Sequence, residues 1–270
     1  MELPDWVPAT MDVSKPSSAR MYDYYLGGTH NFEVDREAAE RAIAVMPFTI
    51  HGARGNRDFL RRAVRHLVES GVTQLLDLGS GIPTVGNVHE VAQRVNPLTR
   101  TVYVDIDPVA VAHSTAILRS NPLATVIHAD MRDTEAVLAH PDVRRLIDFS
   151  EPVGVIMAAV LHFVPESSDP DSIIARYREA VPDGSQLVLS HMSLTGQPAE
   201  MLERFQAVYA NTTNPVVFRS RERIAELFEG FELVEPGLVS LQAWRPDADQ
   251  DSRVNPTHTP GFAGVGRKKS

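Results

Sequence analysis

Short apolar runs alternate with longer helical segments through the middle of the chain, and this alternation limits the fold more than any other sequence feature. Five runs rich in Val, Ile and Leu have the length of strands: Thr73–Leu78, Thr101–Ile106, Thr125–Ala129, Val153–Met157 and Gln186–Ser190. Such runs suit strands that are buried on both faces of a parallel sheet. The segments between them have helical spacing: Val85–Val95, Pro108–Leu118, Thr134–Ala139 and Asp171–Val181. The pattern predicts an open α/β sheet with right-handed crossovers.

The two ends of the chain add further segments to this sheet. Residues 1–70 are predicted to form an N-terminal helical extension, and residues 71–270 the sheet domain. The extension should contain helices at Ser17–Gly28, Phe32–Met46 and Asn56–Ser70, with a loop at His51–Gly55. Near the other end, we expect helices at Ala199–Tyr209 and Ser220–Phe228, and then an antiparallel hairpin of Phe231–Leu241 and Gly261–Arg267. The polar stretch Pro246–Pro260 has the composition of a mobile surface loop.

Composition excludes several classes of protein. The chain has no cysteine, which excludes disulfides, thiolate metal sites and a cysteine nucleophile. Its formal net charge of -9 disfavours nucleic acid as a partner. The ten histidines show no His-x-x-x-His spacing, so we expect no metal site. Without a recognisable secretory signal or an apolar run of membrane-spanning length, the chain is expected to be cytoplasmic.

A glycine turn after the first apolar run is the strongest chemical motif. Leu75–Thr84 reads LLDLGSGIPT, in which Asp77 precedes Gly79 and Gly81. Glycines at this spacing allow a sharp turn and a close approach of a ligand to the backbone. A carboxylate at the turn would repel a pyrophosphate and attract a cation. The motif therefore favours S-adenosylmethionine, which carries an ammonium and a sulfonium, over NAD(P), although an NAD(P) dehydrogenase stays the alternative.

Two further acids follow the next two predicted strands. Asp105 lies twenty-four residues beyond Gly81, where a carboxylate accepts hydrogen bonds from ribose hydroxyls. Asp130 follows the third run, where it could accept the adenine amino group, with Met131 against the ring. Because the carboxyl ends of parallel strands meet at one edge, Asp77, Asp105 and Asp130 are expected to share a nucleoside site.

Several motifs combine into a wider pattern: LDLGSG (76–81), YVDIDP (103–108), HADMRD (128–133), AVLHFVPE (159–166) and ARMYDYYLGGTHNFEVDREAAE (19–40). Together they resemble the class I S-adenosylmethionine-dependent methyltransferases, and more closely the S-adenosyl methyltransferase family formerly classed as a domain of unknown function. The resemblance covers nearly the whole chain. It implies a Rossmann-like seven-stranded α/β sheet in the order 3-2-1-4-5-7-6, with the seventh strand, Gly261–Arg267, antiparallel.

The resemblance also implies S-adenosyl-L-methionine as the cofactor. It places cofactor contacts at Asp77, Gly79, Gly81, Asp105, Asp130 and Met131, and Ser80 and Ile106 belong to the same two motifs. Arg57, at the start of a predicted helix, is a candidate for holding the cofactor carboxylate. The acceptor is predicted to be a small molecule, which the family resemblance does not identify.

Methyl transfer to a hydroxyl or amine needs a base for the departing proton. His162, after the fourth apolar run, is the leading candidate, and His191, at the end of the fifth, is a weaker one. Tyr22 and Tyr25 lie in a tyrosine-rich segment that is predicted to cover the acceptor site as a lid, or else to pack as an ordinary core helix. The alternative function is a non-catalytic sensor or regulator that binds S-adenosylmethionine.

Overall fold

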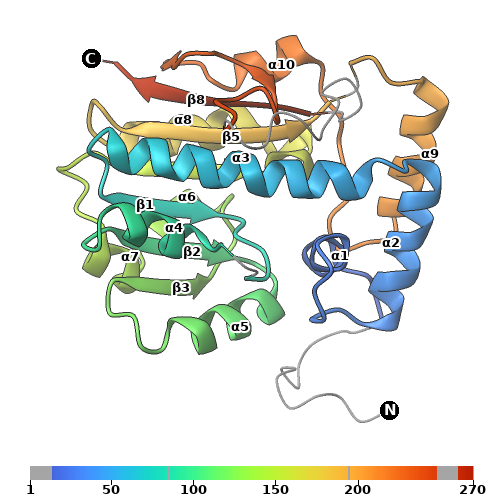
Figure 1. Cartoon of the computed structure of the whole chain (residues 1–270), viewed down its shortest axis with the longest axis horizontal. Coiled ribbons are helices and arrows are strands. Elements are labelled where there is room, and N and C mark those ends of the chain that lie inside the picture. The colour runs from blue at the N-terminus through green and yellow to red at the C-terminus, as the bar shows by residue number, and fades with distance from the viewer. Residues whose placement is uncertain (1–13, 84–85, 194, 248–260, 270) are drawn as a thin grey trace.

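One twisted sheet organises the molecule (Figure 1). The computed structural model describes residues 14–83, 86–193, 195–247 and 261–269. In these residues the strands are β1 (Gln74–Leu78), β2 (Arg100–Asp105), β3 (Ala124–His128), β4 (Gly154–Ala158), β5 (Gln186–Met192), β6 (Phe231–Leu233), β7 (Val239–Ser240) and β8 (Gly261–Lys268). Their order across the sheet is β3-β2-β1-β4-β5-β8-β6, and β7 also pairs with β8. The neighbours among β1 to β5 are parallel, whereas β8 runs antiparallel to β5 and β6.

The strand order expected from the resemblance is confirmed. The seventh strand of that order is β8, which comes eighth in the chain because the two-residue β7 precedes it. It lies between β5 and β6, where Val188 is in register with Val265 and Leu233 with Gly266. Val265 is fully buried. The last strand is therefore an internal part of the sheet.

Helices cover both faces of the sheet. They are α1 (Ser18–Tyr25), α2 (Glu33–Val45), α3 (Thr49–Glu69), α4 (Val88–Val95), α5 (Pro108–Leu118), α6 (Thr134–Ala139), α7 (Pro141–Leu146), α8 (Pro170–Ala180), α9 (Ala199–Tyr209) and α10 (Arg221–Glu226), with 3-10 turns η1 (Leu161–Phe163) and η2 (Glu166–Ser168). The apolar side chains of α3 and α4 belong to the core on one face, and those of α6, α7, α8 and α10 to the core on the other. In Figure 1, α3 lies across the front of the sheet.

Local sequence signals explain several boundaries. Asp107 caps α5 by accepting a hydrogen bond from Val109 N at 2.8 Å, and Pro108 occupies the first turn. Asp169 caps α8 in the same way and is followed by Pro170. The short helix α7 was not expected, because its six residues are too few to show a helical period.

The expected loop at His51–Gly55 is wrong, because these residues lie inside α3, which begins at Thr49. The two glycines in this segment suggested a break. Instead, Gly52 N donates to Phe48 O at 2.9 Å as part of the helix. A Cβ at Gly55 would lie 2.6 Å from the end of the Gln242 side chain, so this glycine packs against a neighbouring segment and does not turn the chain.

The expected antiparallel pairing of Phe231–Leu241 with Gly261–Arg267 is confirmed, but the first of these segments is not one continuous strand. It is divided into β6 and β7 by Pro236 and Gly237, where Gly237 N donates to Val234 O at 2.8 Å. Proline has no backbone N–H to give to a ladder, so the strand stops there. The predicted mobile loop Pro246–Pro260 falls mostly on residues 248–260, which lie outside the described residues.

Helices α1, α2 and α9 form a separate cluster, here called the cap. Its core includes Met21, Tyr25, Ala42, Phe205 and Tyr209, none of which belongs to the two cores on the sheet faces. Figure 1 shows α1, α2 and α9 together beyond the end of the sheet toward which β3 points. The cap therefore stands at the carboxyl edge of the parallel strands. The division at residue 70 stays a proposal, and α3 itself packs into the core of the sheet domain.

A buried ion-pair network attaches the cap to the sheet edge. Arg20 of α1 donates to Asp35 of α2 at 2.7 Å, and its guanidinium lies 3.7 Å from Asp107, which follows β2. Ser17 donates from its hydroxyl to Asp107 at 2.5 Å and from its backbone N–H to Asp35 at 2.9 Å. All four side chains are buried. A buried network of this kind orients its members, because each charge lacks water and depends on its partner.

We expect Arg20→Met to lower the free energy of unfolding by about 3 kcal/mol, since it leaves the buried carboxylates of Asp35 and Asp107 without their cation. Urea denaturation measures this change. Arg41→Met, at an exposed position of α2, is the matched control and should change stability by less than about 0.5 kcal/mol. Equal effects of the two substitutions would contradict the anchoring role of Arg20.

Candidate functional site

A cavity of about 490 Å³ lies where β1, β2, β3 and β4 end, and we call it the edge cavity. Its floor comes from the strand ends, and its walls include Ser17, Ser18 and Arg20 beside α1 and Arg57 on α3. All nine predicted cofactor residues line it: Arg57, Asp77, Gly79, Ser80, Gly81, Asp105, Ile106, Asp130 and Met131. The parallel sheet thus brings together residues that are up to 74 positions apart in the chain.

The glycine turn forms one side of this cavity. Gly79 N and Ser80 N donate to Val104 O at 2.8 and 3.2 Å, which ties the turn to β2. Gly79 has φ +74°, and a Cβ there would lie 2.2 Å from a Val160 methyl. Gly81 has φ +68° with nothing within 4 Å of its Cβ position. The hydroxyl of Ser80 is buried and has no hydrogen-bond partner within the described part of the chain. The turn therefore offers open space and an unsatisfied polar group to a ligand.

The carboxylate of Asp105 is oriented toward this turn. It accepts hydrogen bonds from Gly81 N at 2.6 Å and from Asp107 N at 2.8 Å. Burial raises the pKa of Asp105 to about 6, although these two backbone bonds oppose the rise. An acid held in this way can still accept bonds from ligand hydroxyls, because each carboxylate oxygen has two acceptor sites.

Asp77 is the second buried carboxylate of the edge cavity. Burial raises its pKa to about 7, the charge of Arg57 opposes the rise, and Asp105 adds to it. Two carboxylates in one low-dielectric site repel each other, and Arg57 does not offset their burial. A cationic ligand would relieve this cost, whereas a phosphate-bearing ligand would increase it.

Asp130 and its neighbours form the remaining end of the cavity. Arg132 binds the Asp130 carboxylate with two side-chain nitrogens, at 2.9 and 2.6 Å. Partial burial would raise the pKa of Asp130, but the bonds from Arg132 lower it below its ordinary value. Met131 is buried, and Ile106 is 48% exposed at the rim. A carboxylate beside two apolar side chains is a surface to which a flat, amino-bearing base can bind.

A smaller cavity of about 80 Å³ lies behind the first one, and we call it the inner chamber. It is lined by three of the predicted acceptor-site residues, Tyr25, His162 and His191. Tyr22 lines both cavities, together with Ser18, Asn56, Ala159 and Phe163. A ligand in the edge cavity and a second one in the inner chamber would therefore meet at this shared boundary.

Asn56 is the centre of a hydrogen-bond chain at the boundary. Its amide nitrogen donates to Tyr22 OH, and that hydroxyl donates to Ala53 O, both at 3.0 Å. Its amide oxygen accepts from the Ser190 hydroxyl at 2.5 Å, and this hydroxyl accepts from Ala159 N at 2.9 Å. Ala159 has φ +56°, which is uncommon for a residue other than glycine. This chain of hydrogen bonds fixes the positions of α1, α3, β5 and the end of β4 relative to one another.

His162 lies in η1, directly after β4, and is buried. Its Nδ1 has no partner in the part of the chain that the structure describes. Burial holds the pKa of His162 well below its ordinary value, and the nearby His191 and Arg219 lower it further. The imidazole is therefore neutral at pH 7, and one ring nitrogen can act as a hydrogen-bond acceptor.

His191 differs, because both of its ring nitrogens are used. Arg219 can only donate, so the 2.6 Å contact makes His191 Nε2 the acceptor. The Nδ1–H then donates to Met192 O at 2.5 Å. Burial lowers the pKa of His191 to about 3, with Arg219 contributing. Of the two histidines, His162 is thus the one whose ring keeps a nitrogen without a partner among the described residues.

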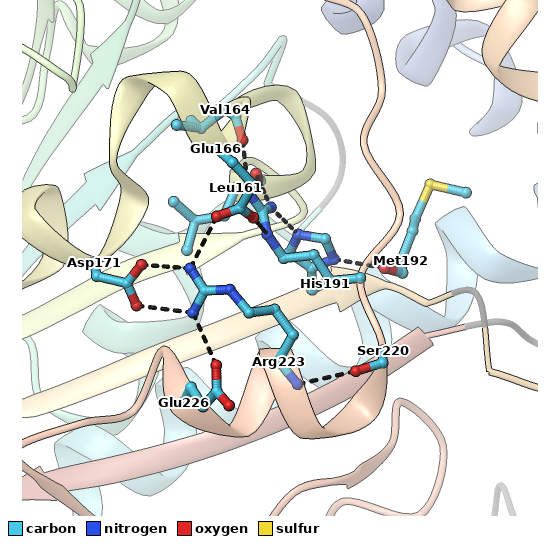
Figure 2. A network of polar contacts seen from close by, with 10 residues as sticks. Leu161, Val164, Glu166, Asp171, His191, Met192, Ser220, Arg223 and Glu226 are labelled. Atoms are coloured by element: carbon cyan, nitrogen blue, oxygen red, sulfur yellow. Dashed lines mark hydrogen bonds and ion pairs between the residues drawn. The ribbon is translucent and has the colours of Figure 1, made fainter.

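Arg219 was not anticipated as a site residue, and it holds the turn that carries His162. Its guanidinium donates to Leu161 O and Val164 O, both at 2.8 Å, and pairs with Glu166 at 2.6 Å. Figure 2 shows how Glu166 in turn contacts Arg223, which also binds Asp171 and Glu226. Sequence reasoning had no signal for this residue, because Arg219 lies 53 positions from Glu166.

The described residues contain no group of three or more His, Asp or Glu side chains arranged to hold a metal ion. Among the helices in the described ranges, none has an apolar stretch that could span a bilayer.

Comparison with known proteins decides the family. The model of a family described as S-adenosyl methyltransferase matches residues 4–269. The chain belongs to this S-adenosyl methyltransferase family. Accordingly, its cofactor is S-adenosylmethionine, and the NAD(P) dehydrogenase alternative is no longer needed. The open space at Gly81, the unsatisfied Ser80 hydroxyl and the buried acids of the edge cavity fit a cationic nucleoside of this kind.

Solved structures agree with this assignment. A Thermobifida fusca protein presumed to be a methyltransferase is 44% identical, with a TM-score of 0.91 over 99% of this chain and 100% of that one. A DUF574 family protein from Streptomyces avermitilis is 37% identical, with a TM-score of 0.91 over 96% and 99%. Human N-acetylserotonin methyltransferase, solved with S-adenosylmethionine, shares only the fold, at 14% identity and a TM-score of 0.51 over 94% and 64%. Among curated proteins, none matches the chain.

The raised pKa of Asp77 leads to a prediction about stability. The folded-state pKa of about 7 exceeds the ordinary 3.8, so the folded protein binds a proton that the unfolded chain releases between these values. Asp77 therefore destabilises the fold increasingly as pH rises from about 4 to 7. Asp77→Asn removes this effect, and its gain in unfolding free energy should be larger at pH 8 than at pH 4, by on the order of 2 to 4 kcal/mol.

Thermal and urea unfolding at the two pH values measure this difference. Asp58→Asn, on the same helix as Arg57 but 44% exposed in its side chain, is the matched control and should show little dependence on pH. A pH-independent effect of Asp77→Asn would mean that the pKa of Asp77 is the same in the folded and the unfolded protein, so that burial does not raise it.

Proposed function

We propose that the protein is an S-adenosylmethionine-dependent methyltransferase that acts on a small-molecule acceptor. The observation that carries this proposal is the boundary shared by two cavities. One cavity has the acids and the glycine turn that suit the cofactor, and the other contains a buried histidine with a free nitrogen. A binding-only sensor needs the first cavity but has no use for the second. The acceptor is expected to be small because the inner chamber holds only about 80 Å³.

The cofactor would be held by opposite charges placed at its two ends. Asp77 faces the ammonium and Arg57 the carboxylate of the methionine portion, which matches the electrostatic coupling of this pair. Asp105 accepts bonds from the ribose hydroxyls. Asp130, Met131 and Ile106 surround the adenine. Gly79, Ser80 and Gly81 supply the close backbone approach, and we propose that the Ser80 hydroxyl donates to the ligand.

The protein's own part in the reaction is alignment and proton removal. When bound, the cofactor supplies an already activated methyl group. Tyr22, Asn56 and Phe163 at the boundary hold the acceptor in line and exclude water. His162 takes the proton of the acceptor, and Tyr25 and His191 form part of the wall against which the acceptor binds. Arg219 acts indirectly, by holding the η1 turn in place.

The proposal is tested by turnover with methyl-labelled S-adenosylmethionine and a small-molecule fraction of a cell extract. Label should appear in a low-molecular-weight product with the wild-type protein. Asp105→Ala should bind S-adenosylhomocysteine about 10- to 100-fold more weakly, as expected when bonds to a charged group are lost. Tight binding of S-adenosylhomocysteine without any labelled product would favour the sensor function instead.

His162→Ala should lower kcat by about 10²-fold or more while leaving the affinity for S-adenosylhomocysteine unchanged. The pH profile separates the two titrating groups. Because the pKa of His162 lies well below its ordinary value, kcat at saturating cofactor should stay level from pH 8 to pH 6.5. In contrast, kcat/KM for the cofactor should fall as pH drops through about 7, where Asp77 becomes protonated.

Steady-state kinetics across this range check both expectations. A His162→Ala variant with full kcat would show that another group, or water, removes the proton. A level kcat/KM would show that the charge of Asp77 does not contribute to cofactor binding.

A further inference from the structure

The inner chamber is uncharged and largely aromatic. Within the described residues that line it there is no Asp, Glu, Lys or Arg. Its apolar walls are Met46, Phe163, Met192, Phe205, Tyr25 and Tyr209. The rings of Phe205 and Tyr209 are stacked at 5.0 Å and 25°, and Phe163 is inclined by 31° to Tyr209 at 6.0 Å. An ionised acceptor would lose its hydration here without gaining a counter-charge. In contrast, an aromatic acceptor could pack its ring against the rings of Phe163, Phe205 and Tyr209, whose planes are inclined to one another by small angles.

Most polar groups of the chamber already bond to one another. The hydroxyls of Tyr25 and Tyr209 share a hydrogen bond at 2.9 Å. Asn56 and His191 have partners for both polar ends of their side chains. Among the described lining residues, Nδ1 of His162 is the fully buried side-chain atom without a partner. His162, the proposed base, is thus the lining residue whose side chain keeps an unsatisfied buried nitrogen.

The surroundings of His162 limit which proton it can remove. The chamber has no carboxylate to stabilise an imidazolium, and the positive charge of Arg219 disfavours one further. Such a base accepts a proton only from a group that releases it readily. A phenolic hydroxyl, with a pKa of about 10, is far more acidic than an alkyl hydroxyl. An apolar cavity of about 150 Å³ can hold benzene, so the inner chamber of about 80 Å³ admits no more than one ring, part of which would extend into the adjoining edge cavity.

We propose that the methyl acceptor is an uncharged single-ring phenol, which is methylated at its oxygen with the ring in the inner chamber. This inference rests on the proposed function. The phenol oxygen forms a bond to the methyl carbon while the carbon–sulfur bond breaks and its electron pair stays on sulfur. The phenolic proton passes to the neutral imidazole of His162, which lines the chamber. The products are a neutral aryl methyl ether and S-adenosylhomocysteine, so that atoms and charge balance once the imidazolium returns its proton to water.

The first experiment isolates the labelled product that the wild-type protein forms from the extract. We expect a neutral compound that absorbs ultraviolet light as an aromatic ring and is not retained by ion exchangers. A charged or non-aromatic product, or one labelled on nitrogen, would overturn this proposal alone. Binding of S-adenosylhomocysteine without methyl transfer to any fraction would overturn the proposed function as well, so the two failures are distinguishable.

The second experiment compares phenol, cyclohexanol, benzoate and aniline as acceptors at equal concentrations. Phenol should be methylated at least about tenfold faster than each of the others, the discrimination expected when a site matches one substrate group and leaves another unpaired. Equal or faster methylation of cyclohexanol, benzoate or aniline would overturn the assignment of a phenol.

A pair of methionine variants tests where the ring binds. Met192 lines the inner chamber, whereas Met201 packs against the same cap cluster without lining it. Met192→Ala should raise the rate with 2-naphthol relative to phenol by roughly tenfold, because it removes several atoms from the wall. Met201→Ala should leave this ratio unchanged. The same ratio in both variants would mean that the ring does not bind in the chamber.

Discussion

Burying two carboxylates beside a glycine turn is the interaction on which the rest of this structure depends. Asp77 and Asp105 lie at the carboxyl ends of adjacent strands, and burial raises their pKa values to about 7 and 6. A fold selected only for stability would place apolar or hydrogen-bonded neutral residues there. The cost is consistent with a site whose missing partner is positively charged. We propose that S-adenosylmethionine, the cofactor of the family, supplies this charge, so that its binding would also relieve the repulsion between the two buried carboxylates.

The cap adds a second layer of organisation over this edge. Helix α1 is attached to Asp107, two residues beyond Asp105, through Ser17 and Arg20. The same helix carries Tyr22, which lies between the two cavities and bonds to Asn56. One short helix thus connects the Asp105 end of the edge cavity to the boundary with the inner chamber. A second network, centred on Arg219 and Glu166, holds the opposite wall and the turn with His162 (Figure 2).

The two cavities also differ in the charge of the side chains that line them. The edge cavity contains the charged side chains, and the lining of the inner chamber has none among its described residues. Charges in a low-dielectric site act strongly on a charged ligand, whereas a neutral apolar chamber selects by shape and by few polar contacts. This division is compatible with a charged methyl donor and a neutral acceptor that meet at Tyr22, Asn56 and Phe163. It also agrees with the neutral state of His162, because burial and the positive charge of Arg219 both lower the pKa of this histidine.

The sequence by itself determined the sheet and the cofactor edge. Alternating apolar runs, two glycines and acids at successive strand ends are local signals, and the residues that they predicted line one cavity, because parallel strands bring their carboxyl ends together. The sequence did not reveal the continuation of α3 through Gly52 and Gly55, the Asn56 hydrogen-bond chain or the role of Arg219. All three features depend on partners that are far away in the chain. A glycine can end a helix or pack inside one, and a buried polar group can be bonded or unsatisfied. Only tertiary packing decides between these outcomes, because it fixes which neighbours each residue has.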